Sequence, residues 1–110
     1  MTEQFEVFIR SFFETNYVVE LPFSGTSMLP TIPKDCCILA QKVSEIKVGD
    51  IYIFLEFDVD CMQTKLVCHR LVARRNDEFV FKGDNRNVCD KPVKLNDILG
   101  QLISIVEKRE

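Results

Sequence analysis

Residues 65–85, KLVCHRLVARRNDEFVFKGDN, contain two runs that are rich in β-branched and aromatic side chains. The dipeptide Asn76-Asp77 separates the runs, and Gly83-Asp84-Asn85 follows the second one. Asn, Asp and Gly are favoured in turns, whereas β-branched and aromatic residues are favoured in strands. The stretch therefore predicts two strands, Lys65–Arg74 and Glu78–Lys82, with turns after each.

Four further runs of the same kind surround this stretch and predict the rest of a sheet. They are Tyr17–Phe23, Cys36–Gln41, Ile51–Phe57 and Leu99–Val106. Turn residues such as Pro33-Lys34-Asp35 and Gly49-Asp50 separate them. We expect a mainly β protein, a compact antiparallel β domain.

The N-terminal residues have a different periodicity, which predicts an amphipathic α-helix over residues 4–14 that ends near Asn16. Its apolar stripe consists of Phe5, Phe8, Ile9, Phe12 and Phe13. Packing of this stripe on the sheet is the expected role, and a membrane-surface helix is the alternative. Acidic residues at positions 3, 6 and 14 disfavour the alternative, because such helices usually carry Lys and Arg.

The length of 110 residues suits one domain, expected to span residues 1–110 with a helix at 1–16 and a β core at 17–110. No apolar run approaches the ~20 residues that a transmembrane helix needs. The start of the chain also lacks the basic region of a secretory signal. We expect a cytoplasmic protein.

Charge and cysteine content exclude several classes of partner. The formal net charge is -3, and the basic pairs Arg74-Arg75 and Lys108-Arg109 are isolated, so a nucleic-acid partner is not expected. Five cysteines, an odd number, do not form a disulfide framework in so short a chain, which favours reduced thiols. Residues Cys61, Cys68, His69 and Cys89 lack the spacing of common zinc sites, so we expect no metal and no cofactor.

A cluster of small polar residues, SGTSMLPTI at 24–32, could expose a reactive hydroxyl at Ser27. The lone histidine, His69, could remove its proton, and Asp84 or Asp90 could orient the imidazole. Each feature also has an ordinary explanation, namely a surface turn, a structural histidine and a polar loop.

Taken together, the motifs SGTSMLPT, VGDIYIF, CHRLV, FVFKGDNRNVCD and ILGQLISI resemble the signal peptidase I family of serine endopeptidases. More distantly, they are similar to the LexA-type self-cleaving repressors, which share its catalytic β core. The resemblance extends from Ser24 to about Ile105. It implies a peptidase that acts on peptides or proteins, with small side chains just before the scissile bond.

The resemblance also implies roles for individual residues. Ser27 would be the nucleophile, in a turn shaped by Met28, Pro30 and Thr31. His69 occupies the position of the general base, as in the endoplasmic-reticulum and archaeal members, whereas bacterial members usually carry lysine there. If His69 were not the base, Lys65 or Lys82 would be the candidates. The arginine of GDNR is similar to the lysine type, so the chain mixes features of both.

For the acids, the spacing in the histidine type favours Asp90 as the carboxylate that orients the imidazole. Asp84 would share this role or brace the loop. Ser27 would supply its own N–H to the oxyanion hole. Many family members add a serine hydroxyl two positions earlier, where this chain has Gly25. Ser24 or Thr26 would then be the substitutes.

The leading hypothesis is a soluble serine endopeptidase that forms an acyl-enzyme. The family's membrane anchor is absent from this sequence, so we expect cytoplasmic substrates, or action at a membrane surface when a partner protein targets it there. A peptide-binding domain without catalysis is one alternative, supported by the missing hydroxyl at Gly25. A self-cleaving regulatory domain is the other, although no helix-turn-helix precedes the core.

Overall fold

The computed structural model describes residues 3–106. Its elements are α1 (Glu3–Thr15), β1 (Val18–Phe23), β2 (Cys36–Lys42), β3 (Ile51–Asp58), β4 (Gln63–Arg75), β5 (Glu78–Lys82), β6 (Val93–Lys94), the 3-10 helix η1 (Leu95–Asp97) and β7 (Ile98–Val106). The expected limits at Met1 and Glu110, and the Lys108-Arg109 pair, lie outside the described residues.

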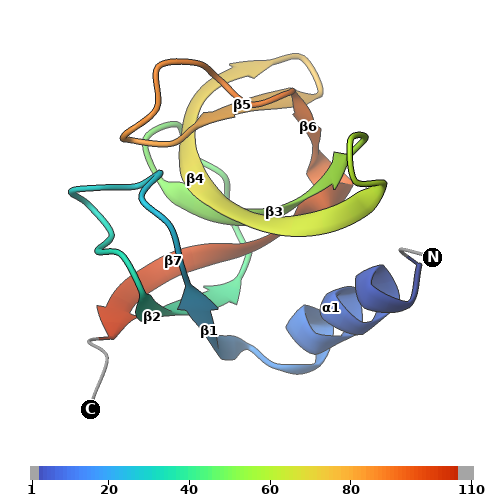
Figure 1. Ribbon diagram of the computed structural model, residues 1–110. Helices are drawn as coiled ribbons and strands as arrows, with labels where there is room; N and C mark the ends of the chain where they lie inside the picture. The colour runs from blue at the N-terminus through green and yellow to red at the C-terminus, as the bar shows by residue number, and fades with distance from the viewer. Residues whose placement is uncertain (1–2, 107–110) are drawn as a thin grey trace.

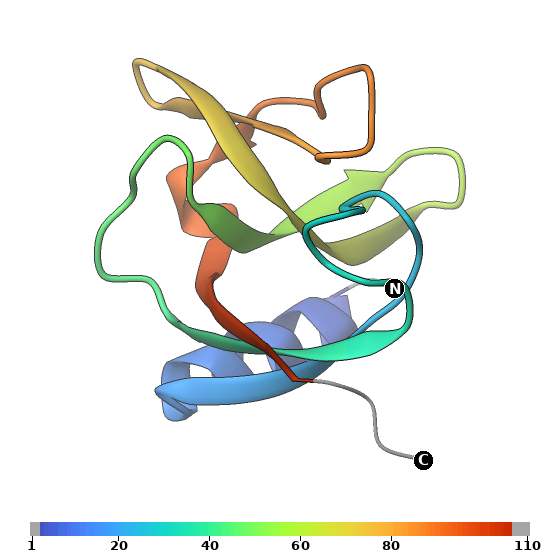
Figure 2. The same cartoon turned by 90° about the vertical axis from the view of Figure 1, so that its left-hand side faces the viewer.

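The strands form one antiparallel sheet in the order β1-β2-β7-β3-β4-β5-β6. The sheet is strongly curved, and the long strand β4 bends around one end of the molecule (Figure 1). Figure 2 shows α1 beside β1 and β2, away from the β4–β5 end. The prediction of a mainly β antiparallel fold with one N-terminal helix is confirmed.

The expected strands are all present, with end points that differ by at most two residues from the prediction. Strand β6 and helix η1 were not predicted, because the segment Val93–Asp97 is short and has no periodic pattern. Three of the predicted turns contain a residue with left-handed backbone: Asp35, Asn76 and Gly49 have φ angles of 58°, 55° and 104°.

Strand β3 lies between two apolar cores, which explains its uninterrupted apolar sequence. Side chains of a strand point alternately to opposite faces. Ile51, Ile53 and Leu55 pack into the core that also contains Met28 and the buried helix residues. On the other face, Tyr52 and Phe54 pack into a second core with Leu71, Phe79 and Phe81.

Helix α1 docks through the C-terminal part of its apolar stripe. Ile9 and Phe13 are 5% and 2% exposed. Phe13 packs directly over the backbone of Gly100 in β7. At the helix end, the Asn16 N–H and side-chain amide both donate to the Phe12 carbonyl, at 3.1 and 3.0 Å.

The expectation that the whole stripe packs on the sheet is wrong for its first part. Phe5 and Phe8 are 42% and 63% exposed. The residues of α1 that are buried against the sheet are Ile9 and Phe13. Phe5 lies one turn before Ile9, and Phe8 lies on the margin of the stripe, so both rings remain exposed.

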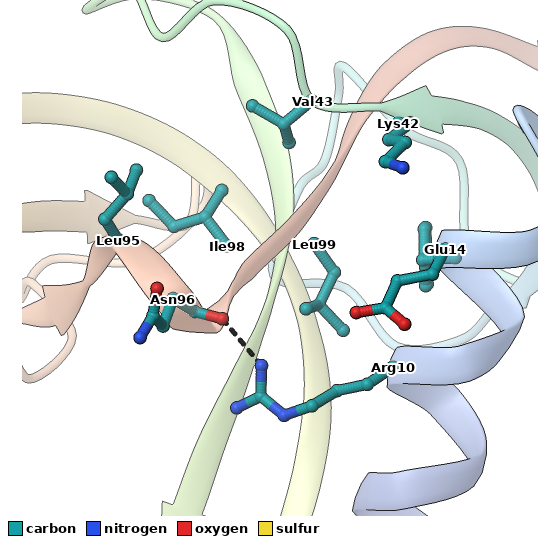
Figure 3. A pocket seen from close by; sticks show the side chains of 9 residues that line it. Arg10, Glu14, Lys42, Val43, Leu95, Asn96, Ile98 and Leu99 are labelled. Atoms are coloured by element: carbon teal, nitrogen blue, oxygen red, sulfur yellow. Dashed lines mark hydrogen bonds between the residues drawn. The ribbon is translucent and has the colours of Figure 1, made fainter.

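A second contact holds α1 against η1 and the start of β7. Arg10 donates to the Asn96 carbonyl at 2.6 Å (Figure 3), to Asp97 at 2.5 Å and to Glu6 at 3.0 Å. Beside it lies a pocket of about 290 Å³, which Glu14 and Lys42 also line. These interactions fix the position of the helix relative to the sheet.

Candidate active site

The segment 24–32 forms a tight turn between β1 and β2. Gly25 adopts a left-handed φ of 94°, which costs glycine little. Met28 is fully buried and anchors the turn in the core. The Leu29 N–H donates to the Thr26 carbonyl at 3.2 Å. Ser27 is consequently held at the surface of the core, where it is half-buried.

His69, on β4, lies between the turn and the loop that follows β5. It is 6% exposed, and its Nε2 atom lies 3.1 Å from Ser27 Oγ. Its Nδ1 atom lies 2.5 Å from Asp90 Oδ2. With the proton on Nδ1, the imidazole donates to Asp90 and accepts from the Ser27 hydroxyl. In this arrangement the imidazole can remove a proton from the Ser27 hydroxyl, and the Asp90 carboxylate can stabilise the imidazolium that results.

Asp84, the other expected acid, is not in contact with the imidazole but pairs with Arg70. Arg70 Nε and Nη2 lie 2.9 and 2.8 Å from its two carboxylate oxygens. The Thr31 hydroxyl also donates to Asp84, at 2.5 Å. The hydrogen bonds from Arg70 lower the pKa of Asp84 below its ordinary value. Asp84 thus joins β4, the serine turn and the loop.

The loop after β5 packs against the serine turn so closely that Gly83 has no room for a side chain. A Cβ at Gly83 would lie 2.7 Å from the Ser27 carbonyl oxygen and 3.2 Å from His69 Nε2. The Asn85 N–H donates to the Ser27 carbonyl at 2.8 Å, and its side-chain amide donates to Thr26 at 3.0 Å. The Asp84 N–H contacts the sulfur of Met28 at 3.3 Å.

Sequence reasoning did not assign Gly83, Asn85 or Arg70 to the site. The GDN motif contributed to the family resemblance, but of its three residues only Asp84 was given a role. Only the three-dimensional contacts show that it packs on the serine turn. Arg70 follows the histidine on β4 and faces away from it, so its partner could not be deduced from strand alternation alone.

The two alternative bases lie in other contacts. Lys65 forms an ion pair with Asp58 at 2.8 Å. Lys82 donates to the carbonyl of Gly83 at 3.3 Å. His69, in contrast, lies within hydrogen-bonding distance of the Ser27 hydroxyl.

The cysteines do not offer a competing nucleophile beside the histidine. Cys68 precedes His69 and is 6% exposed. Burial raises the pKa of Cys68 to about 12, so the thiol stays protonated at neutral pH. All five cysteines are unpaired, and Cys61 and Cys89 are exposed. Within residues 3–106 no group of three or more His, Cys, Asp or Glu side chains is placed to bind a metal ion.

Ser27 and His69 form part of the wall of an open cleft of about 390 Å³. Ser24 also lines this cleft, whereas the side chain of Thr26 is at the exposed surface. The remaining wall is mostly apolar. It comprises Phe5, Ile9, Leu21, Pro22, Phe23, Ile38, Ile53, Leu66, Val67 and Cys68. A cleft of this size, next to the hydrogen-bonded side chains of Ser27, His69 and Asp90, is typical of a ligand site.

Among the described residues, no helix has the length and apolar content needed to cross a membrane.

Comparison with protein families matches residues 2–103 to the family described as Peptidase S24-like. Comparisons with curated proteins and with solved structures gave no match. The superfamily expected from the motifs is confirmed, and the closer assignment to signal peptidase I stays a prediction. Since the match covers nearly the whole chain, the protein belongs to the Peptidase S24-like family, within the superfamily of LexA and the signal peptidases.

Proposed function

We propose that the protein is a serine endopeptidase that cleaves a peptide or protein substrate through Ser27, His69 and Asp90. The observation that carries this proposal is the hydrogen-bonded series from the Ser27 hydroxyl through the imidazole to the Asp90 carboxylate. Membership of a peptidase family supports it independently. The base would be of the histidine type, similar to that of part of the signal peptidase I family.

In the proposed reaction, Ser27 Oγ attacks the carbonyl carbon of the scissile peptide bond while His69 Nε2 accepts the hydroxyl proton. Asp90 keeps the Nδ1 proton facing it and stabilises the imidazolium. The tetrahedral intermediate collapses, and the imidazolium gives its proton to the departing amine. Water, activated by the same imidazole, then hydrolyses the acyl-enzyme and releases Ser27.

The negative oxygen of the tetrahedral intermediate would be stabilised by the Ser27 N–H. In the described part of the chain this N–H has no hydrogen-bond partner, so it can donate to an oxyanion. One such donor contributes roughly 2.7–4 kcal/mol. Gly25 offers no hydroxyl, whereas Ser24 lines the same cleft and is the candidate for a second donor.

The alternative function is a domain that binds peptides without cleaving them, or a regulatory domain that cleaves only its own chain. The glycine at position 25 favours the peptide-binding form of this alternative, because the oxyanion would have one donor fewer. A family that includes self-cleavage is compatible with either function.

Labelling with a fluorophosphonate probe tests the proposal, because an activated serine attacks the phosphorus of such a probe, displaces fluoride and becomes phosphonylated. We expect the wild-type protein and Ser11→Ala, which removes an exposed hydroxyl on α1, to be labelled, and Ser27→Ala to be unlabelled with an unchanged melting temperature. Absence of labelling in the folded wild-type protein, or equal labelling of Ser27→Ala, would refute Ser27 as the nucleophile.

We also propose that residues 1–110 act as one domain, in which helix 1–16 and the β core 17–110 share the apolar core around Ile9 and Phe13. A cytoplasmic location is proposed as well, and the five unpaired cysteines support it. Thiol titration of the protein purified from cells without reductant checks this: five reactive thiols after denaturation are expected.

A further inference from the structure

The cleft beside Ser27 has one wall that does not come from the β core. Phe5 and Ile9, one helical turn apart on α1, line it together with Ser27 and His69. Ile9 is 5% exposed because it also packs into the core, whereas Phe5 remains 42% exposed. The first turns of α1 therefore form a side of the cleft.

The composition of the cleft restricts what can bind there. Among the described lining residues, none carries a charge apart from His69 when it is protonated. Leu21 and Phe23 of β1, and Leu66 of β4, supply further apolar surface of the cleft. A charged side chain entering this space would lose its hydration without gaining a counter-ion. A large aliphatic or aromatic side chain would instead bury apolar area.

We propose that Phe5 and Ile9 form an apolar subsite, which makes this protein select extended peptides that carry a large aliphatic or aromatic side chain near the residue held at Ser27. The inference rests on the proposed peptidase function for the identity of the ligand as a peptide. The volume of about 390 Å³ is at the lower end of the range of ligand sites, roughly 300–1,000 Å³, and accommodates more than a small residue. Helix α1 is then a specificity element as well as a packing element.

The position of Phe5 offers a matched pair of variants. Phe8 lies on the same helix and is 63% exposed, but it does not line the cleft. Both Phe5→Ser and Phe8→Ser remove an exposed ring, so both should keep the wild-type melting temperature within a few degrees. A difference in peptide binding between the two variants can therefore be assigned to the cleft and not to the general hydrophobicity of the helix.

The test uses two fluorescein-labelled, end-capped peptides of alternating alanine and leucine, or alternating alanine and serine. Binding is measured by fluorescence anisotropy in the Ser27→Ala background, where no cleavage occurs. We expect the leucine peptide to bind roughly tenfold or more tightly than the serine peptide. Phe5→Ser should remove most of this difference, and Phe8→Ser should leave it within about twofold.

Equal binding of the two peptides, or equal effects of Phe5→Ser and Phe8→Ser, would overturn the subsite. Fluorophosphonate labelling of Phe5→Ser with Ser27 intact distinguishes failure of the subsite from failure of the proposed peptidase function. The small probe reacts at Ser27 and does not need to contact α1. Normal labelling without leucine preference refutes the subsite alone. Leucine preference that depends on Phe5, without labelling of the wild-type protein, supports the subsite and refutes the peptidase.

Discussion

The two acidic residues of the GDNRNVCD motif differ in their partners, and this difference predicts different consequences of mutation. Asp90 contacts His69 at 2.5 Å, whereas Asp84 binds Arg70 and Thr31. Asp90→Asn should lower kcat by roughly 10³–10⁴-fold, because an amide favours the wrong imidazole tautomer. Its melting temperature should change little.

Asp84→Asn should instead act mainly on stability. The substitution removes the ionic partner of Arg70, and a loss of about 1 kcal/mol would lower the melting temperature by roughly 4–8 °C. Turnover of a peptide substrate and thermal unfolding, measured on both variants, test the two roles. If Asp84→Asn loses more activity than Asp90→Asn at equal stability, the roles assigned to the two carboxylates must be exchanged.

The pKa of Asp84 also predicts how stability depends on pH. Arg70 lowers this pKa in the folded protein, whereas in the unfolded chain it is near the ordinary value of ~3.9. The unfolded state therefore binds the proton more readily, so the contribution of Asp84 is fully present above about pH 5. It is lost as the pH falls below about 4 through the folded-state pKa.

Urea denaturation of wild type and Asp84→Asn between neutral pH and about pH 2.5 measures this contribution. The difference between their free energies of unfolding should be largest near neutral pH and should shrink on acidification. A difference that stays constant across this range would show that the Arg70–Asp84 pair does not stabilise the fold through its charge.

Strands and the helix were predictable because their patterns are local. Runs of β-branched and aromatic residues, separated by turn residues, located β4 and β5. The 3.6-residue period of the apolar residues located α1. The split of the stripe into buried Ile9 and exposed Phe5 was not predictable, since it depends on how α1 docks on the sheet. The two-residue strand β6 is too short to show any period.

The contact between α1 and β7 predicts a sensitive glycine. A Cβ at Gly100 would lie 2.6 Å from Cε1 of Phe13 and 3.3 Å from the Gln41 carbonyl oxygen. Gly100→Ala should therefore push the helix from the sheet and cost about 1–3 kcal/mol, as overpacking of a core usually does. Chemical denaturation measures the loss.

Phe13→Leu provides the control, because a smaller side chain makes room for the new methyl group. In a double-mutant cycle, Gly100→Ala should cost less in the Phe13→Leu background than in wild type. Additive effects of the two substitutions would show that the phenylalanine ring is not what excludes a side chain at Gly100.

At the scale of the molecule, the candidate site joins three segments that are distant in sequence. Ser27 comes from the turn after β1, His69 from β4 and Asp90 from the loop after β5. Motif order suggested these residues, although their catalytic roles remain predictions. The cleft itself could not be predicted, because its walls come from α1, β1, β2, β3 and β4 and exist only when the sheet is curved.

The surface of the whole molecule predicts weak interaction with lipid. Phe5, Val7 and Phe8 are exposed on α1 and could contact a bilayer. However, the formal net charge is -3, and Arg10 on the same helix is already paired with Glu6 and Asp97. Membrane-surface helices gain about 1 kcal/mol from each basic residue near anionic lipid, and α1 has no such gain.

Flotation with vesicles of neutral phosphatidylcholine, and with vesicles that also contain phosphatidylserine, tests this expectation. Little protein should float with neutral vesicles, and adding the anionic lipid should not increase the bound fraction, because the protein's own charge is negative. Phe8→Ser, which leaves the cleft unchanged, should reduce any residual binding. Strong flotation with anionic vesicles that Phe8→Ser abolishes would make α1 a membrane-contacting helix, and its exposed phenylalanines would then have a role other than walling the cleft.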